Sequence, residues 1–225
     1  MKSKLQELLE EIRSVMSGSN RIVDALLPAM LFLLLNSVST LAAAAWASGV
    51  LAVLLTLYRL WKRQPIGYAL AGLATSLLAV AMAVWAGSPQ GYFLPDMITN
   101  AMLALIALIS LFIQRPMVAY TSLIARRWPA GWYWHARVRP AYSEVTIAWA
   151  VFFVVRLALQ IAVYQQANLQ QITLVNLLSG WPSTFTLLIL SYLYGTWRLR
   201  QLQGPSVQEF KESASPPWQG QRRGF

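Results

Sequence analysis

Apolar residues fill six long stretches of the chain, and polar residues gather in the shorter segments that separate them. A helix needs roughly 20 residues to cross a hydrocarbon core of about 30 Å. Each stretch is close to that length, which predicts an all-α fold with six transmembrane helices. We place these spans at about residues 22–38, 40–60, 66–87, 96–113, 141–164 and 172–195. The transmembrane domain as a whole is then expected to cover residues 21–200.

The two ends of the chain follow other patterns. Residues 1–20 carry apolar side chains at helical spacing with Lys and Glu between them, which predicts a cytoplasmic amphipathic helix on the membrane surface. Residues 201–225 are rich in Gly, Pro, Ser and Gln, a composition typical of disorder. We therefore expect a disordered cytoplasmic tail.

The loop between the fourth and fifth spans, residues 114–140, is long enough to hold structure of its own. Pro116 can only begin a helix, so the apolar residues after it predict a short interfacial helix that follows span four. The aromatic and basic side chains beyond it are expected among lipid headgroups, where each basic residue contributes about 1 kcal/mol to the binding of anionic lipid. The alternative is that they only set the topology. The predicted lipid-interface residues are Arg126, Arg127, Trp128, Trp132, Trp134, Arg137 and Arg139.

Basic residues are confined to one end of each predicted hairpin. All but one of the 18 Lys and Arg residues lie in four clusters, and the far turn of each hairpin between two clusters has none. This is the distribution that the positive-inside rule describes. It predicts a multi-pass protein of the bacterial plasma (inner) membrane with both termini in the cytoplasm. The clusters are residues 2–21, 59–63, 115–139 and 198–223.

The returning ends of spans two, four and six resemble one another. Each is a run of apolar residues that closes on basic residues and then a proline, at Pro65, Pro116 and Pro205. This similarity indicates three repeated helical hairpins, an arrangement that generates many transporter folds. The alternative is that any span returning to the cytoplasm ends in aromatic, basic and helix-breaking residues. Both interpretations stay open at this point.

Composition supports the membrane assignment and excludes several kinds of site. The chain is 57% hydrophobic and 12% charged, whereas soluble domains are about 45–50% apolar and about 25% charged. The net charge of +10 is explained by retained cytoplasmic Lys and Arg, so we expect no nucleic-acid partner. The absence of Cys, the single His135 and the lack of any catalytic motif lead us to expect no enzyme, no metal and no cofactor.

The one basic residue outside the clusters is Arg156, which lies within the fifth apolar stretch. A charge at the centre of a spanning helix costs about 2.5–3.5 kcal/mol, so its side chain is expected to face protein or water. Gln160 follows it by one turn, and Asp96 with Asn100 one turn deeper is the nearest acidic candidate at that level. Two interpretations follow: a staple that joins spans four and five, or a polar cavity, open to the outside, that holds an anionic ligand.

Two further carboxylates, Asp24 and Glu144, lie near the inner surface. Asp24 follows Arg21 by three residues, which favours a local ion pair. Glu144 falls in the first turn of the predicted fifth span, where a carboxylate suits the helix dipole. The functional alternative is that both carry protons or cations at the inner mouth of a pathway.

A set of short motifs resembles an uncharacterised bacterial family of six-span membrane proteins, a domain of unknown function found mainly in actinobacterial and Chloroflexi-type lineages. The motifs are Asp24-Ala-Leu-Leu-Pro28, Tyr92-Phe-Leu-Pro95 with Asn100, Gln114-Arg-Pro116, and Tyr142 followed by Trp149, Phe153, Arg156 and Gln160. Residues 161–164 depart from the Leu-Pro-Leu-Tyr ending that we associate with that family. A weaker similarity, through Arg115-Pro116 and residues 148–153, is to the intracellular septation protein A family.

The resemblance implies no catalytic residues, and its second part implies a role in the cell envelope through other membrane proteins. Our first hypothesis is therefore a non-enzymatic cell-envelope or membrane-assembly protein, with the bilayer, anionic headgroups, other membrane proteins or its own copies as partners. The alternative is a small-solute transporter or channel with a polar outer cavity around Arg156.

Overall fold

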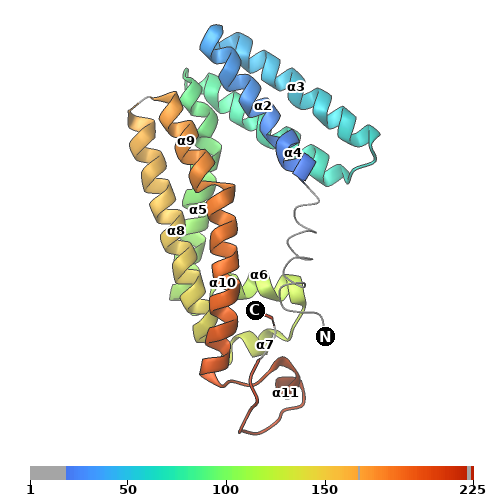
Figure 1. The fold of residues 1–225 in the computed structure, drawn as a ribbon, viewed down its shortest axis with the longest axis vertical. Helices are drawn as coiled ribbons and strands as arrows, with labels where there is room; N and C mark the ends of the chain where they lie inside the picture. The colour runs from blue at the N-terminus through green and yellow to red at the C-terminus, as the bar shows by residue number, and fades with distance from the viewer. Residues whose placement is uncertain (1–18, 167, 222–223) are drawn as a thin grey trace. The chain divides into compact units, whose positions relative to one another are not determined.

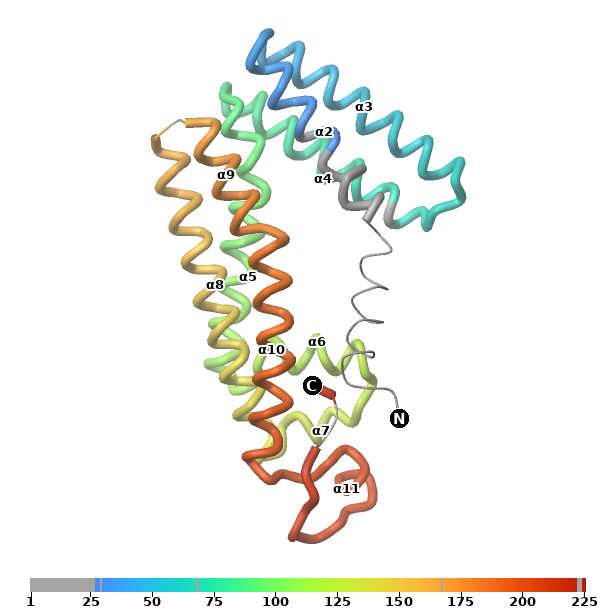
Figure 2. Tube along the Cα trace, in the orientation of Figure 1, coloured from blue at the N-terminus to red at the C-terminus, as the bar shows by residue number. Residues whose placement is uncertain are grey.

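The computed structural model describes residues 19–166, 168–221 and 224–225, without the side chains of residues 19–26, 29 and 68. These residues are mostly helical and include no strands. The amphipathic helix predicted for residues 1–20 therefore lies almost wholly outside the described residues, as does the side chain of Asp24. The chain divides into two compact units, Met1–Pro95 and Asp96–Phe225. Figures 1 and 2 trace both units from blue to red.

Unit 1 holds the helices α2 (Ser19–Val38), α3 (Leu41–Trp61) and α4 (Ile66–Trp85), followed by the 3₁₀ helix η1 (Pro89–Phe93). Thr40 is the N-cap residue of α3, because its side chain accepts a hydrogen bond from the Ala43 amide at 3.2 Å. The core centres on the buried ring of Phe32, which stacks on Tyr92 with 4.8 Å between centroids. The neighbouring helices contribute alanines, whose small side chains allow close packing: Ala44, Ala45 and Ala83.

Unit 2 holds α5 (Leu94–Phe112), α6 (Met117–Arg126), α7 (Ala130–Tyr133), α8 (Arg139–Gln165), α9 (Leu169–Ser179), α10 (Trp181–Leu202) and α11 (Val207–Lys211). Helices α5, α8 and the α9–α10 pair run beside one another, while α6, α7 and α11 gather at one end (Figure 1). α5 begins two residues before the unit boundary and carries the chain from unit 1 into unit 2.

The helix predicted after Pro116 is present as α6. Pro116 occupies its N-cap position, as expected for a residue that has no amide hydrogen to donate. The helix ends at Arg126. The next residue, Arg127, is its C-cap, and its left-handed φ of 55° prevents another turn. The chain then turns at Pro129 into the short helix α7.

The last apolar stretch is a broken helix. Asn168 caps α9 by accepting from the amides of Gln170 and Gln171, each at 3.1 Å. The helix stops at Gly180, and Pro182 at the start of α10 removes an amide that a continuous helix would require. Helices α9 and α10 therefore follow one another with an interruption between them.

Among the described residues, four helical segments are long and apolar enough to cross a membrane: Leu41–Trp61, Pro89–Phe112, Arg139–Gln165 and Leu169–Leu202. The prediction of six spans is wrong by this measure. The first predicted span corresponds to α2, and the side chains of residues 19–26 at the start of this helix are not among those described. The apolar part of α4, Ala69–Trp85, would extend roughly 26 Å at 1.5 Å per residue, which is less than the hydrocarbon thickness of about 30 Å.

The C-terminal segment differs from the disordered tail that its composition predicts. Ser206 and Glu209 form a reciprocal capping box at the start of α11, and the Glu209 carboxylate also accepts from the Gln219 amide at 2.7 Å. These backbone hydrogen bonds lower the pKa of the Glu209 carboxyl below its ordinary value. A Gly-, Pro- and Gln-rich segment thus folds locally because its few side-chain acceptors are placed on its own amides.

Candidate functional site in the polar contacts of unit 2

Arg156 pairs with Asp96, so the only basic residue outside the sequence clusters has an acidic partner. The Arg156 Nη2 atom on α8 lies 2.8 Å from the Asp96 Oδ2 atom in the first turn of α5. The Arg156 side chain is 14% exposed and the Asp96 side chain is 44% exposed. The ion pair thus joins two helices, and it is enclosed on the arginine side and open on the carboxylate side.

Gln160 extends this pair into a network that includes a third helix. Its Nε2 atom donates to Asp96 Oδ2 at 2.7 Å and to Asn176 Oδ1 on α9 at 2.5 Å. Its Oε1 atom accepts from Asn100 Nδ2 on α5 at 3.1 Å. Gln160 is fully buried and Asn100 nearly so, with relative exposures of 0% and 2%. One amide side chain therefore ties α5, α8 and α9 together.

The structure thus brings together all four residues of the predicted intramembrane cluster and adds Asn176, which the sequence analysis did not select. Asn176 is an amide among the apolar residues of α9, and that isolation is the signal that would have marked it. We refer below to Asp96, Asn100, Arg156, Gln160 and Asn176 as the polar network.

Two atoms of the polar network are buried without a hydrogen-bond partner: Arg156 Nε and Asn100 Oδ1. An unsatisfied buried polar atom costs about 1–3 kcal/mol. The network therefore adds less net stability than its number of contacts suggests. Its clear consequence is specificity, because these groups meet only when α5, α8 and α9 present the correct faces to one another.

Glu144 is paired in a second polar contact near the other end of α8. Its carboxylate receives two hydrogen bonds from Arg198 on α10, with Nε–Oε2 and Nη2–Oε1 distances of 2.8 Å each, and a third from the Tyr194 hydroxyl at 2.8 Å. The first-turn placement predicted for Glu144 is wrong, because α8 begins at Arg139 rather than at residue 141. A bidentate arginine, and not the helix dipole, is its principal partner.

Two weaker contacts complete the attachment of α8 to its neighbours. The Trp149 indole donates to the Ser191 hydroxyl on α10 at 3.0 Å. The Val118 amide at the start of α6 donates to the Thr146 hydroxyl at 3.3 Å. α8 therefore has polar contacts with α5, α6, α9 and α10, and it is the central helix of unit 2.

A family model described as a protein of unknown function (DUF3159) matches residues 16–201. The chain belongs to this family. No curated protein and no solved structure matches the chain. The matched residues include the whole polar network and the Glu144–Arg198 pair, while α11 and the segment that follows it lie beyond the match.

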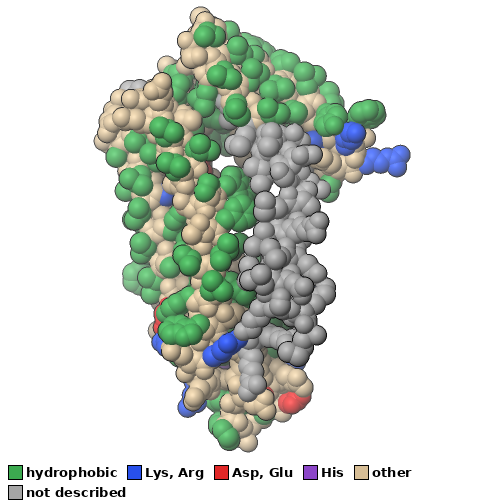
Figure 3. All heavy atoms as spheres, in the orientation of Figure 1, with side chains coloured by type: hydrophobic (Ala, Val, Ile, Leu, Met, Phe, Trp, Pro, Cys, Tyr) green, Lys and Arg blue, Asp and Glu red, His purple; other side chains and the backbone are tan. Residues whose placement is uncertain are grey.

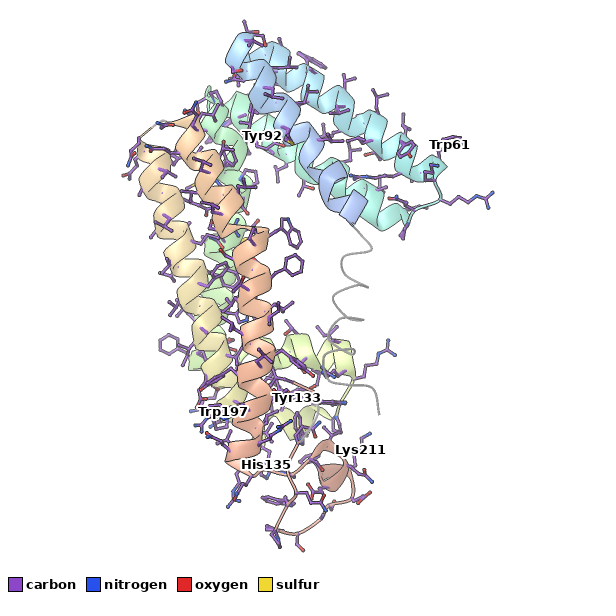
Figure 4. The ribbon with its side chains drawn as sticks, viewed as in Figure 1. Trp61, Tyr92, Tyr133, His135, Trp197 and Lys211 are labelled. Carbon is purple, nitrogen blue, oxygen red and sulfur yellow. The ribbon has the colours of Figure 1, made fainter. Side chains whose placement is uncertain are left out.

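Aromatic side chains form a second core at the end of unit 2 that carries α7 and α11. We call it the aromatic cluster. Tyr133 and His135 are among the residues labelled at this end in Figure 4. Burial raises the pKa of the Tyr133 phenol, whereas partial burial, together with the nearby Arg137 charge, lowers the pKa of the His135 imidazole. The buried members of the cluster are Ala119, Trp132, Tyr133, Val138, Ala141, Tyr142 and Leu199.

The aromatic cluster changes the interpretation of the predicted lipid-interface residues. Trp132 does not lie among headgroups, because it is 0% exposed and donates its indole hydrogen to the Pro205 carbonyl at 2.8 Å. Trp128 and Trp134 are half-buried around it, while Arg127 and Arg137 are exposed. A run of alternating aromatic and basic residues looks the same in a sequence whether its aromatic rings face lipid or a protein core.

The remaining arginines of this region have partners within the chain. The Arg139 Nη1 atom donates to Gln114 Oε1 at 2.8 Å, and the Arg126 guanidinium lies 5.1 Å from the centre of the Trp128 ring. The Arg137 guanidinium lies 5.5 Å from the Trp218 ring. These contacts fix the guanidinium groups on the surface of the aromatic cluster.

The polar network offers little chemistry for a reaction. Its only carboxylate, Asp96, is neutralised by Arg156 and already accepts from Gln160. Within the part of the chain that the structure describes, no three His, Asp or Glu side chains come together in a way that could hold a metal ion. The arrangement is suited to holding helices in register or to holding one anion in place of Asp96.

Proposed function

We propose that the chain is a non-enzymatic integral membrane protein whose unit 2 is a fixed helical scaffold acting through helix and lipid contacts, as expected of a cell-envelope or membrane-assembly factor. The observation that carries this proposal is the enclosure of Arg156 at 14% exposure in an ion pair between α8 and α5. Together with the Glu144–Arg198 pair it holds α8 at two levels, which suits a scaffold better than a moving gate.

The outer surface of the helices supports the lipid part of the proposal. Large apolar side chains are exposed along α5, α8 and α10, including Leu105 at 58%, Val151 at 56% and Leu188 at 54%. Figure 3 shows hydrophobic side chains spread over the helices of the visible face, with few charged ones among them. Such a surface is stable in a bilayer and unfavourable in water.

The charge distribution supports an orientation within that bilayer. The basic clusters would face the cytoplasm, with both termini on that side, in the plasma membrane of a bacterium. The side chains of Arg127 and Arg137 are exposed, so these two arginines are the ones that could meet anionic headgroups.

One observation favours a second candidate, a small-solute transporter or channel. Asp96 is 44% exposed, and the adjacent Asn100 Oδ1 and Arg156 Nε atoms are buried without partners. A small anion that displaced the Asp96 carboxylate could satisfy the arginine. In that case the polar network would be the floor of a solute site.

Cysteine accessibility distinguishes the two candidates, because the chain has no native cysteine. Ala104→Cys would place a thiol one turn beyond Asn100 on α5, at a position that is 6% exposed. The matched control is Gln166→Cys, in the exposed turn between α8 and α9.

In the scaffold, a membrane-impermeant thiol reagent should modify Ala104→Cys at least about 100-fold more slowly than Gln166→Cys in intact cells. Similar rates at the two positions would overturn the scaffold proposal, because they require a water-filled route to the polar network.

A further inference from the structure

The last residue of the chain, Phe225, is held by residues from three helices of unit 2. Its ring stacks on Tyr142 of α8, with 4.3 Å between centroids and 9° between planes. Its terminal main-chain oxygen accepts from Arg126 Nε of α6 at 2.9 Å. The Phe225 ring also covers Gly195 of α10, where an added Cβ atom would collide with it. We call this arrangement of Arg126, Tyr142 and Gly195 the Phe225 site.

The Phe225 site is specific for the shape of its occupant. Position 195 leaves room for the ring because it is a glycine. A Cβ atom at this position would collide with the Phe225 ring. Gly224 has a φ of 83° and lies against Arg126 and Trp128, so a larger residue before the phenylalanine would be strained. The site therefore selects a glycine followed by an aromatic residue.

The chemistry of the Phe225 site matches the main chain of its occupant as well as a hydrophobic ring. The Arg126 guanidinium, fixed over Trp128, donates to the terminal main-chain oxygen of the occupant. The Tyr142 hydroxyl is buried and has no hydrogen-bond partner. Stacking on Tyr142 and a charge-assisted hydrogen bond together recognise an aromatic residue by its ring and by its main chain.

The rest of the C-terminal segment makes contacts of its own with the same end of unit 2. Trp132 donates to the Pro205 carbonyl, Phe210 packs on Gly131, and Trp218 meets the edge of His135 with 5.3 Å between centroids. These contacts bring residues 204–221 close to the aromatic cluster independently of Phe225. Phe225 thus binds its site from a segment that is already tethered nearby.

We propose that the Phe225 site is a docking site for a Gly-aromatic peptide, and that the chain's own C-terminal segment fills it as a latch joining α6, α8 and α10. The occupant is the same chain, because the contacts of Pro205, Phe210 and Trp218 hold the segment at the site. The proposal goes beyond the scaffold function and does not depend on it, since the polar network takes no part in it.

A peptide that competes with the latch tests this proposal on the full chain in detergent micelles. The probe is a fluorescent peptide with the sequence of residues 214–225 and a free C-terminal carboxylate, and the control peptide carries Ala in place of its last Phe. Binding is followed by fluorescence anisotropy. The wild type should bind the probe poorly, because its own Phe225 fills the site.

The Phe225→Ala variant empties the site and should bind the probe at least about tenfold more tightly than the wild type does. It should also prefer the probe to the control peptide by at least about tenfold. The double variant Phe225→Ala, Gly195→Leu should lose this binding, because the leucine side chain occupies the place of the ring. Equal binding of probe and control peptide, or undiminished binding by the double variant, would overturn the proposal.

Release of the latch in the intact chain gives a second measurement that does not require peptide binding. Trypsin should cleave after Arg222 and Arg223 at least about tenfold faster in Phe225→Ala and in Gly195→Ala than in the wild type. Phe112→Ala, which removes a phenylalanine that is 86% exposed on α5, is the matched control and should leave the rate unchanged. An unchanged cleavage rate in both site variants would contradict the latch. If the wild type elutes as a dimer and the Phe225→Ala variant elutes as a monomer, docking within one chain is contradicted.

Discussion

At the scale of single residues, the polar network shows how a long apolar helix can keep a charge. Arg156 is enclosed, but the Asp96 carboxylate compensates its charge, and the buried amide of Gln160 donates to the same carboxylate. Removing one member of such a pair leaves the other uncompensated, and this is more harmful than replacing both. The effect of a substitution at this site should therefore depend on what remains of the pair.

Asp96→Asn should lower the free energy of unfolding by about 2 kcal/mol, because the Arg156 charge then has no carboxylate. This value is below the 3–5 kcal/mol of fully buried pairs, since Asp96 is partly exposed and its charge is screened. The double variant Asp96→Asn, Arg156→Met should recover most of the loss. Thermal unfolding of the purified protein in detergent measures both, and a double variant less stable than Asp96→Asn would disprove the coupling.

His135 provides a pH-dependent contact outside the long apolar helices. Because its pKa is lowered in the folded protein, the unfolded chain binds the proton more tightly, and stability should fall as the pH drops through the unfolded value of about 6.5. Between pH 7.5 and pH 5.5 the wild type should lose more stability than His135→Gln, which cannot take up this proton. Equal losses in thermal unfolding would show that the His135 environment does not oppose its charge.

At the scale of the helices, α8 is the element that makes polar contacts with α5, α6, α9 and α10. Its partners could be predicted from the sequence only in part. Asp96 was identifiable because a buried arginine requires an acid and few acids lie at its depth. Arg198 and Asn176 were not, because the sequence does not reveal which faces of α9 and α10 turn toward α8.

Arg198→Lys tests the clamp between α8 and α10. Lysine retains the charge but cannot make the two parallel hydrogen bonds to Glu144, so the variant should unfold at a lower temperature than the wild type in detergent. Arg127→Lys, at an exposed arginine of the same unit, is the control and should change stability by less than about 0.5 kcal/mol. Equal effects of the two substitutions would mean that the bidentate geometry contributes nothing measurable.

At the scale of the whole molecule, fold class was easier to predict than the number of spans. Hydropathy identifies apolar stretches reliably, and the described residues are indeed mostly helical, without strands. It does not determine where a helix starts, how much of it is apolar, or whether a break such as Gly180 divides it. The same limit explains Trp132, whose burial depends on the Pro205 carbonyl from a distant part of the chain.

The orientation of the chain in the membrane is testable with single cysteines. Gln166→Cys, between α8 and α9, should react with a membrane-impermeant thiol reagent in intact cells. Glu212→Cys, just after α11, should react only after lysis, because the topology proposed from the basic clusters puts that end in the cytoplasm. Labelling of Glu212→Cys in intact cells would reverse the assigned topology.

The interruption between α9 and α10 has a consequence for how this chain tolerates the insertion of a residue. Asn176 sets the rotation of α9 against Gln160, while Ser191 and Arg198 set the rotation of α10 separately. In a continuous helix, one inserted residue would rotate everything after it by about 100° and separate all later partners. Because the helix is already broken at Gly180, a residue added there can be absorbed by the interruption. Each half then keeps its own alignment with α8.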